Sequence, residues 1–143
     1  MKYLVIGLGN FGNTLACNLT DMGHDVIGVD SNEHRIEEIK EKIAVSYIMD
    51  ATEKAALRSL PLDEIDCAVV AIGQSMDSSL RIVASLKEMK VTPIYARALD
   101  MTHKSILAAM NIQKIFIPES LAAGIIAENL VDKDSGNSTE VSI

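Results

Sequence analysis

The sequence has little cysteine and no long apolar segment. Its two cysteines, Cys17 and Cys67, are far apart and form no CxxC motif of the kind that binds zinc or exchanges disulfides. We expect both to be small core residues. No apolar stretch approaches the roughly 20 residues that a membrane helix requires, and no basic leader or cleavage site follows Met1. These absences predict a cytoplasmic protein that does not itself insert into a membrane.

An excess of basic residues is also absent. The chain has 13 Lys and Arg against 20 Asp and Glu, a net charge of -7 that repels nucleic acid and anionic lipid surfaces. There is no G-x-S-x-G nucleophile elbow, and His24, His34 and His103 lack the spacing of a metal site or of a nucleophile and base pair. We therefore expect no nucleic-acid partner, three surface histidines, and a protein that is not an enzyme.

What the sequence does contain is a regular alternation of two patterns. Short apolar runs rich in Val and Ile are typical of parallel strands buried on both faces; they span residues 3–7, 25–30, 44–50, 66–73, 93–97 and 114–118. Stretches with one polar face predict helices at residues 11–22, 33–41, 53–59, 76–89, 103–109 and 121–131. Right-handed crossovers then predict a Rossmann-like α/β fold, with six parallel strands in the doubly wound order 3-2-1-4-5-6 and helices on both faces.

The end of the chain departs from this alternation. Residues 1–131 are predicted to form one domain, whereas residues 132–143 are polar and show no sustained period, which predicts a linker or a frayed tail. The segments Ser105–Ile112 and Leu121–Leu130 contain more apolar surface than one sheet face requires. Either they pack in the core, or the final helix pairs with a second subunit.

Three glycines lie between the first predicted strand and the first predicted helix. Gly7, Gly9 and Gly12 form G-x-G-x-x-G in the strand-to-helix context that nucleotide binding requires. Gly7 permits a tight turn, Gly9 lets backbone amides approach a phosphate, and Gly12 lets the helix pack closely on the strand. A phosphate would lie at the positive N-terminus of that helix. A turn without a ligand is the alternative; the residues assigned to the phosphate-binding turn also include Leu8, Asn10 and Phe11.

An acidic residue stands where this motif requires one. Asp30 ends the second predicted strand, 18 residues after Gly12, where a carboxylate accepts hydrogen bonds from both hydroxyls of an adenosine ribose. Its charge disfavours a 2′-phosphate, so NAD(H), ADP, ATP or AMP fits and NADP fits poorly. We include Ser31 in this ribose site. The alternative role of Asp30 is a turn or a helix cap ahead of residues 31–35.

The third predicted strand ends near the same edge of the sheet. Asp50, Ala51 and Thr52 follow it, and a carboxylate there either accepts a hydrogen bond from an adenine amino group or belongs to the start of the next helix. Thr52 either caps the helix that begins at Glu53 or contacts the ligand.

Two further segments end strands on the other half of the sheet. Ala71, Ile72 and Gly73 close the fourth strand at the point where the strand order reverses, and they either leave room for a ribose or phosphate or make a turn. Arg97 ends the fifth strand and supplies either a counter-charge to a diphosphate or a surface salt bridge.

The ordered series VIGLGNFG, MGHDVIGVD, MDAT, AVVAIG, ARA and IPE resembles the RCK domain, also called KTN or TrkA-N, over about residues 1–131. This family provides the cytosolic nucleotide-binding module of bacterial potassium uptake systems and of some potassium channels and antiporters. The resemblance implies binding of NAD+, NADH, ATP, ADP or AMP in the crevice and homodimers that often form octameric rings. It also implies control of a membrane potassium transporter or channel subunit at the inner face of the cell membrane.

Carried over to this sequence, the resemblance assigns the phosphates to the glycine turn and Arg97, and the ribose and adenine to the acidic strand ends. Glu119 matches a glutamate that binds a divalent cation at the dimer interface in some members, although by itself it is an acid in the first turn of a helix. Asn10 stands where the family often has Arg for a terminal phosphate, which disfavours a strong preference for ATP. Many members continue into a second, C-terminal module; by this resemblance the sequence is expected to be either the N-terminal part of a longer protein or a protein that lacks that module.

These predictions favour a ligand-sensing regulatory domain of a potassium transport system. A small NAD(H)-dependent oxidoreductase, or the cofactor-binding half of one, is the alternative; it would need a second half that orients a substrate and moves a proton. An assembly module whose crevice holds no ligand is a third interpretation.

Overall fold

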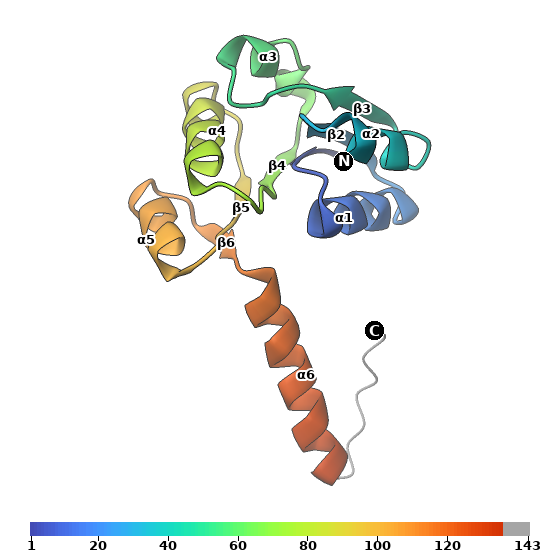
Figure 1. Cartoon of the computed structure of the whole chain (residues 1–143), viewed down its shortest axis with the longest axis vertical. Helices are drawn as coiled ribbons and strands as arrows, with labels where there is room; N and C mark the ends of the chain where they lie inside the picture. The colour runs from blue at the N-terminus through green and yellow to red at the C-terminus, as the bar shows by residue number, and fades with distance from the viewer. Residues whose placement is uncertain (136–143) are drawn as a thin grey trace.

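The computed structural model describes residues 1–135, with side chains as far as Asp132, and contains the predicted sheet (Figure 1). Six strands lie in the order β3-β2-β1-β4-β5-β6, and every pairing is parallel. The strands are β1 (Lys2–Ile6), β2 (Asp25–Asp30), β3 (Val45–Ile48), β4 (Cys67–Val70), β5 (Ile94–Arg97) and β6 (Lys114–Phe116). The helices are α1 (Asn10–Asp21), α2 (Glu33–Ile39), α3 (Lys54–Arg58), α4 (Met76–Glu88), α5 (Met101–Ala109) and α6 (Pro118–Ser135), with a short 3-10 helix, η1 (Leu62–Glu64). The doubly wound α/β prediction is confirmed.

Alternate residues of the central strand face two separate cores. Leu4 packs in one cluster with residues of α3, α4 and α5, including Leu86, whereas Val5 packs in the other with Ala16 of α1 and Ile39 of α2. All five side chains are fully buried. Burial of one such Leu, Ile or Val side chain contributes about 1.5–3 kcal/mol, so the apolar strand runs both select the parallel sheet and stabilise it. Helices on both faces of the sheet are thereby confirmed.

The strand order reverses at β1: β2 and β3, which follow it in sequence, lie on one side of it, and β4 to β6 lie on the other. Leu4 of β1 lies opposite Ile27 of β2 and opposite Ala68 of β4. The chain moves outward through β2 and β3, returns to β4, and then moves outward again through β5 and β6. The connections that follow β1 and β4 therefore separate at the carboxyl ends of the two strands, and this is where open α/β sheets bind ligands.

Several strands end before the apolar runs that predict them, among them β3 and β4. β3 ends at Ile48 rather than at Asp50, and β4 ends at Val70 rather than at Gly73. The last residues of each run leave the hydrogen-bonded ladder and enter the loops beside the central crevice. Asp50 and Gly73 are therefore positioned by loops at the edge of the sheet, not by the strands themselves.

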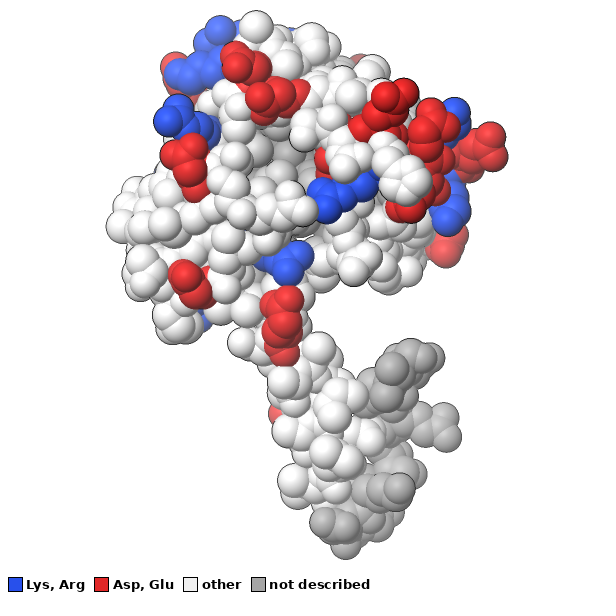
Figure 2. Space-filling model, in the orientation of Figure 1, with Lys and Arg blue, Asp and Glu red and all other residues white. Residues whose placement is uncertain are grey.

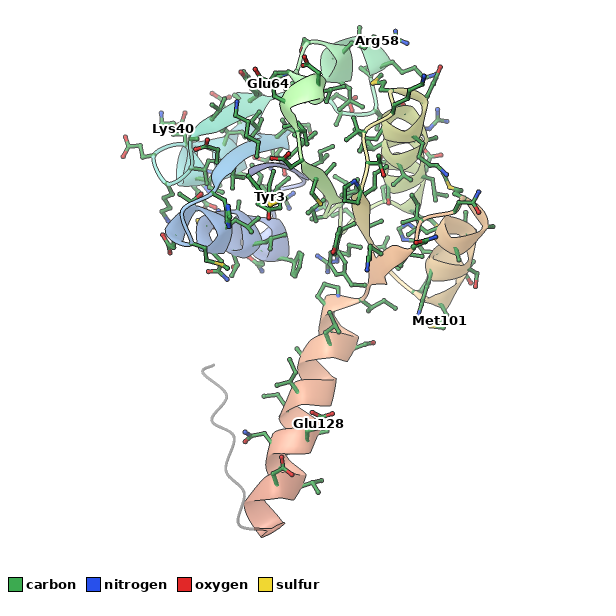
Figure 3. The ribbon with its side chains drawn as sticks, turned by 180° about the vertical axis from the view of Figure 1, so that it is seen from behind. Tyr3, Lys40, Arg58, Glu64, Met101 and Glu128 are labelled. Carbon is green, nitrogen blue, oxygen red and sulfur yellow. The ribbon has the colours of Figure 1, made fainter. Side chains whose placement is uncertain are left out.

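The last helix leaves the body of the protein. α6 begins at Pro118 and ends at Ser135, so it is longer at both ends than the predicted helix 121–131. It projects away from the sheet, with Glu128 far from the other helices (Figures 1 and 3). No glycine or proline interrupts the sequence between Gly124 and Ser135. The predicted tail is thus helical at residues 132–135, and its remainder lies outside the described residues. No helix in the described part of the chain combines the length and apolar character needed to cross a membrane.

One histidine is buried, contrary to the prediction of three surface histidines. His103 on α5 is 0% exposed. Its Nδ1 accepts a hydrogen bond from the Leu99 amide at 3.0 Å, so its Nε2 bears the proton and donates to Ser79 Oγ of α4 at 3.1 Å. Burial lowers the pKa of His103 below its ordinary value, while nearby Asp100 acts in the opposite direction. Of the cysteines, Cys67 is buried and Cys17 is half-buried.

The neutral His103 predicts a loss of stability in acid. The unfolded chain takes up a proton on this imidazole below a pH of about 6.5, and the folded protein does so only at lower pH. The free energy of unfolding should therefore fall from pH 7 to pH 5, by at most about 1.4 kcal/mol per pH unit from this residue. Urea denaturation across this range, with His103→Gln against the exposed-site control His34→Gln, should show a smaller pH dependence in the His103 variant only. An NMR titration that gives His103 a pKa at or above 6.5 would contradict the prediction.

Candidate nucleotide-binding site

A cavity of about 430 Å³ opens at the carboxyl ends of the strands, between the two halves of the sheet. Figure 2 shows a hollow in the surface there, with basic and acidic side chains near its rim. Its volume lies within the range typical of small-molecule sites. The cavity brings together most of the residues predicted from the sequence: Gly7, Gly9, Asn10, Phe11, Asp30, Ser31, Asp50, Ala51, Thr52, Ala71, Ile72, Gly73, Arg97 and Glu119.

Two predicted residues, Leu8 and Gly12, do not line the cavity. Leu8 is 1% exposed and packs in the core beneath α1 and α2. Gly12 is inside α1, and a Cβ atom at this position would lie 1.8 Å from the carbonyl oxygen of Gly7. Both residues therefore support the turn through packing. The Leu8 side chain fills the core beneath it, and the absence of a side chain at Gly12 lets α1 lie against the Gly7 carbonyl.

The three glycines of the turn differ in whether packing would exclude a side chain at that position. Gly7 has a φ of +94°, and a Cβ there would lie 3.0 Å from the Ala71 carbonyl carbon, so a side chain would be strained and crowded. A Cβ at Gly9 would have the Arg35 guanidinium as its nearest neighbour, 3.8 Å away, which is ordinary contact. Packing explains Gly7 and Gly12 but not Gly9. A bare backbone at Gly9, on the cavity wall at the start of α1, fits the close approach of a phosphate.

Asp30 connects the glycine turn to α2. Its Oδ2 accepts a hydrogen bond from the Leu8 amide at 2.8 Å, and its Oδ1 accepts one from the Asn32 amide at 2.8 Å. The helix cap is Asn32 rather than Asp30, because the Asn32 side chain accepts hydrogen bonds from the His34 and Arg35 amides. Asp30 is 8% exposed and lines the cavity, where it can accept hydrogen bonds from a ribose.

The Asp50–Thr52 segment forms a local turn beside the cavity. Asp50 Oδ1 accepts hydrogen bonds from the Thr52 amide at 3.0 Å and from the Thr52 hydroxyl at 2.6 Å. Residue Glu53 occupies the position before α3 and makes no side-chain cap, so the interpretation of Thr52 as a helix cap is wrong. The second Asp50 carboxylate oxygen accepts none of the hydrogen bonds found in this turn, which leaves an acceptor on the cavity rim.

Arg97 enters the cavity from the opposite side. Its Nη2 lies 3.1 Å from Glu119 Oε1 at the start of α6, and its guanidinium lies 5.9 Å from the centre of the Phe11 ring. The side chain is only 19% exposed, and its buried Nε has no hydrogen-bond partner among the described residues. Arg97 thus forms the predicted salt bridge, while its role as a counter-charge to a diphosphate stays a prediction.

The structure shows no metal centre around Glu119. No three His, Cys, Asp or Glu side chains in the described part of the chain come together as metal ligands. Glu119 is 73% exposed and is paired with Arg97. Its role as a divalent-cation ligand at a subunit interface stays a prediction.

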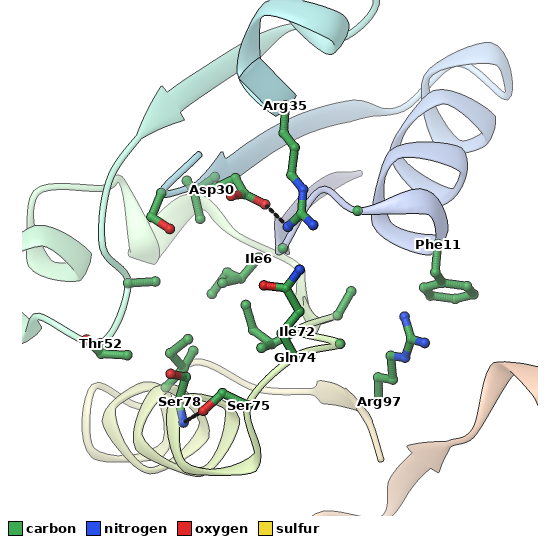
Figure 4. A pocket seen from close by; sticks show the side chains of 18 of the residues that line it. Ile6, Phe11, Asp30, Arg35, Thr52, Ile72, Gln74, Ser75, Ser78 and Arg97 are labelled. Carbon is green, nitrogen blue, oxygen red and sulfur yellow. Dashed lines mark hydrogen bonds and ion pairs between the residues drawn. The ribbon is translucent and has the colours of Figure 1, made fainter. Parts of the chain in front are cut away.

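Sequence reasoning missed four polar residues that line the cavity: Arg35, Gln74, Ser75 and Ser78. Figure 4 shows Arg35 reaching in from α2 beside Asp30, across the cavity from Arg97 and Phe11. Ser75 caps α4 by accepting a hydrogen bond from the Ser78 amide at 3.1 Å. The cap was visible as a serine before an apolar-periodic stretch, and Arg35 as a basic residue in the first turns of the helix after Asp30.

Comparisons with known proteins agree with this geometry. Residues 3–118 match the TrkA-N domain family. Ktr system potassium uptake protein A of Bacillus subtilis is 31% identical over 141 residues, which cover 99% of this chain and 64% of that protein. The chain thus spans less than two thirds of the length of this relative.

Solved structures of other proteins share this fold. The Kef C-terminal domain of Shewanella denitrificans in its AMP-bound form has a TM-score of 0.73 at 22% identity, covering 92% of this chain and 82% of that one. The GsuK channel bound to NAD has a TM-score of 0.69 at 18% identity, covering 82% of this chain and 21% of that one. At these identities the likeness extends to the fold alone.

The contact at Gly12 predicts which substitution the glycine turn cannot accept. Gly12→Ala places a methyl group against the Gly7 carbonyl and should lower the free energy of unfolding by at least about 2 kcal/mol. Gly124→Ala is the matched control, because a Cβ added to this other helical glycine would have no atom within 4 Å. The control should gain about 0.5–1 kcal/mol from helix propensity. Chemical denaturation measures both, and a Gly12→Ala protein as stable as the wild type would contradict the prediction.

Proposed function

The chain belongs to the TrkA-N domain family, and on this premise we propose that it is the nucleotide-sensing regulatory domain or subunit of a potassium transport system. The observation that supports this most is the cavity in which the bare backbone of Gly9 and the Asp30 carboxylate face one space. A phosphate site after β1 and a ribose site at the end of the neighbouring strand β2 suit an adenine nucleotide. The chain would act in the cytoplasm, on a membrane-embedded partner.

The proposed ligand is NAD(H) or an adenine nucleotide. Its phosphates would lie over the glycine turn at the N-terminus of α1, its ribose would donate hydrogen bonds to Asp30, and its adenine would lie toward Asp50 and Thr52. The Asp30 carboxylate would repel the 2′-phosphate of NADP. Neutral Asn10 at the glycine turn provides no counter-charge to a third phosphate, so ATP would gain little over ADP.

The proposed signal from ligand to partner passes through Arg97. Its guanidinium faces the cavity and pairs with Glu119 in the first turn of α6. A ligand phosphate near Arg97 would compete with Glu119 for the same donors. Ligands that differ in charge or length would then either keep or break the Arg97–Glu119 pair at the start of α6. Allosteric coupling requires such a difference between the two ligand-bound states.

We also propose that α6 pairs with a second copy of this chain. Leu121, Ile125, Leu130 and Val131 are between 53% and 67% exposed on this helix. Figure 2 shows that the visible face of α6 beyond its first turns has few charged side chains. Large apolar side chains exposed together on one helix are normally covered in a folded assembly. Dimerisation would also place the nucleotide sites of two subunits on one assembly, as control of a shared pore requires.

Nucleotide binding predicts a specific loss in an Asp30 variant. Calorimetric titration with NAD+, NADH, ATP, ADP and AMP should detect binding of at least one ligand by the wild type. Asp30→Asn should weaken that binding about 10- to 100-fold, because hydrogen bonds to a charged acceptor are lost. Asp63→Asn makes the same change of charge on exposed η1 and should bind like the wild type. The proposal fails if the wild type binds none of the five, or if folded Asp30→Asn binds as the wild type does.

Self-association predicts a change in mass. Light scattering at micromolar concentration should give the wild type at least twice the 15.5 kDa chain mass. Ile125→Glu introduces a charge on the exposed face of α6 and should reduce the mass to that of a monomer. Met101→Glu is the matched control, since Met101 is a similarly exposed residue on α5. A monomeric wild type would exclude pairing through α6, and equal effects of the two variants would exclude α6 as the interface.

A further inference from the structure

Arg35 occupies a position between the proposed ribose and phosphate sites. It extends from α2, its side chain is 31% exposed, and its Nη1 lies 3.4 Å from Asp30 Oδ2. Its Cζ and Nη2 atoms lie 3.8 Å from the position that a Cβ would take at Gly9. The guanidinium is therefore hydrogen-bonded to the carboxylate that would accept the ribose hydroxyls and lies beside the glycine over which a phosphate would lie (Figure 4).

The acceptor capacity of Asp30 is nearly used in this arrangement. A carboxylate has about four acceptor positions, and three donors occupy Asp30: the Leu8 amide, the Asn32 amide and Arg35. A ribose brings two hydroxyl donors, so one present donor has to leave. The two amides belong to the glycine turn and the start of α2, at 2.8 Å each, whereas Arg35 is a flexible side chain at 3.4 Å. Arg35 is the donor that can leave without unfolding the site.

A displaced guanidinium keeps its charge, because arginine stays protonated in proteins, and a nearby anion would stabilise it. Arg97, the other basic residue that lines the cavity, already pairs with Glu119. Asn10 adds no positive charge to the glycine turn. The guanidinium lies beside the space over Gly9, where a 5′-phosphate would lie and would supply such an anion, whereas the carboxylate of Glu38 on the same helix is paired with His34.

We propose that Arg35 exchanges the Asp30 carboxylate for a 5′-phosphate of the bound nucleotide, and so frees Asp30 to accept the ribose hydroxyls. This assignment rests on the proposed function, since it requires a nucleotide in the cavity. Arg35 is then a specificity-determining residue. It favours ligands that contain both a ribose and a 5′-phosphate, and it opposes those that contain a ribose alone.

The exchange has a signature that a merely structural role lacks. With a phosphorylated ligand, Arg35 gains a partner as it leaves Asp30. With adenosine it gains none, so it competes with the ribose for the carboxylate. Removing the guanidinium should therefore weaken binding of ADP and leave adenosine binding unchanged or tighter.

The test is calorimetric titration of the wild-type chain, Arg35→Gln and Arg35→Lys with ADP, 5′-AMP, 2′-AMP and adenosine. Arg35→Gln should raise the Kd for ADP about tenfold or more, with no weakening for adenosine. Arg35→Lys, which keeps the charge, should recover part of the ADP affinity. Lys42→Gln is the matched control, because Lys42 lines the neighbouring groove with Arg35 but not the cavity, and it should change the Kd for ADP by less than twofold. Circular dichroism and thermal melting confirm that each variant is folded.

Three results would overturn the assignment while nucleotide binding stands. Equal weakening of ADP and adenosine would mean that Arg35 positions Asp30 or contacts the base. An unchanged Kd for ADP would mean that no phosphate meets Arg35. An effect confined to 2′-AMP would place the phosphate contact at the 2′ position of the ribose instead of the 5′ position. Failure of the wild type to bind any of the tested nucleotides would overturn the proposed function itself.

Discussion

The Asp30 carboxylate joins the parts of the chain that form the cavity. Its two oxygens hold the amide of Leu8 in the glycine turn and the amide of Asn32 at the start of α2, and Arg35 pairs with it from above the cavity. Because Asp30 is 8% exposed, these bonds are shielded from water, and the loss of one leaves a buried polar group unsatisfied. A single residue thus positions the turn over which a phosphate would lie and presents the acceptor that a ribose would need.

Two arginines approach the cavity from opposite sides, each held by a carboxylate. Arg35 is paired with Asp30 inside the site, and Arg97 is paired with Glu119 at the beginning of α6. An anionic ligand would offer both guanidinium groups a second partner. In the proposed function, the exchange at Arg35 sets the affinity for the nucleotide, and the exchange at Arg97 changes the contact that holds the start of α6. Ligand binding and its effect on α6 then depend on the same kind of event, in which an arginine exchanges a protein carboxylate for a ligand anion.

Most of the fold could be predicted because its signals are local. The Val- and Ile-rich runs produce the strands, and Gly7 and Gly12 stand where a sharp turn and a close helix contact exclude side chains. Predictions failed where a residue's surroundings come from distant segments. His103 is buried because Ser79 of α4 and the Leu99 amide satisfy its ring, and nothing within its own helix indicates those partners. Thr52 bonds back to Asp50 rather than to α3, which an isolated helix-start pattern cannot distinguish.

The sequence by itself determined the glycine turn and the acidic residue at the end of β2, since each follows from backbone geometry over a few residues. The strand order followed from the alternation of strands and helices along the chain together with the right-handed crossover rule. Tertiary structure alone decided that Leu8 faces the core, that Arg35 reaches Asp30, and that Arg97 meets Glu119. It also decided that α6 leaves the sheet instead of covering it. The physical reason is that a long side chain or a terminal helix can reach many neighbours, and only the packing of elements distant in sequence selects one of them.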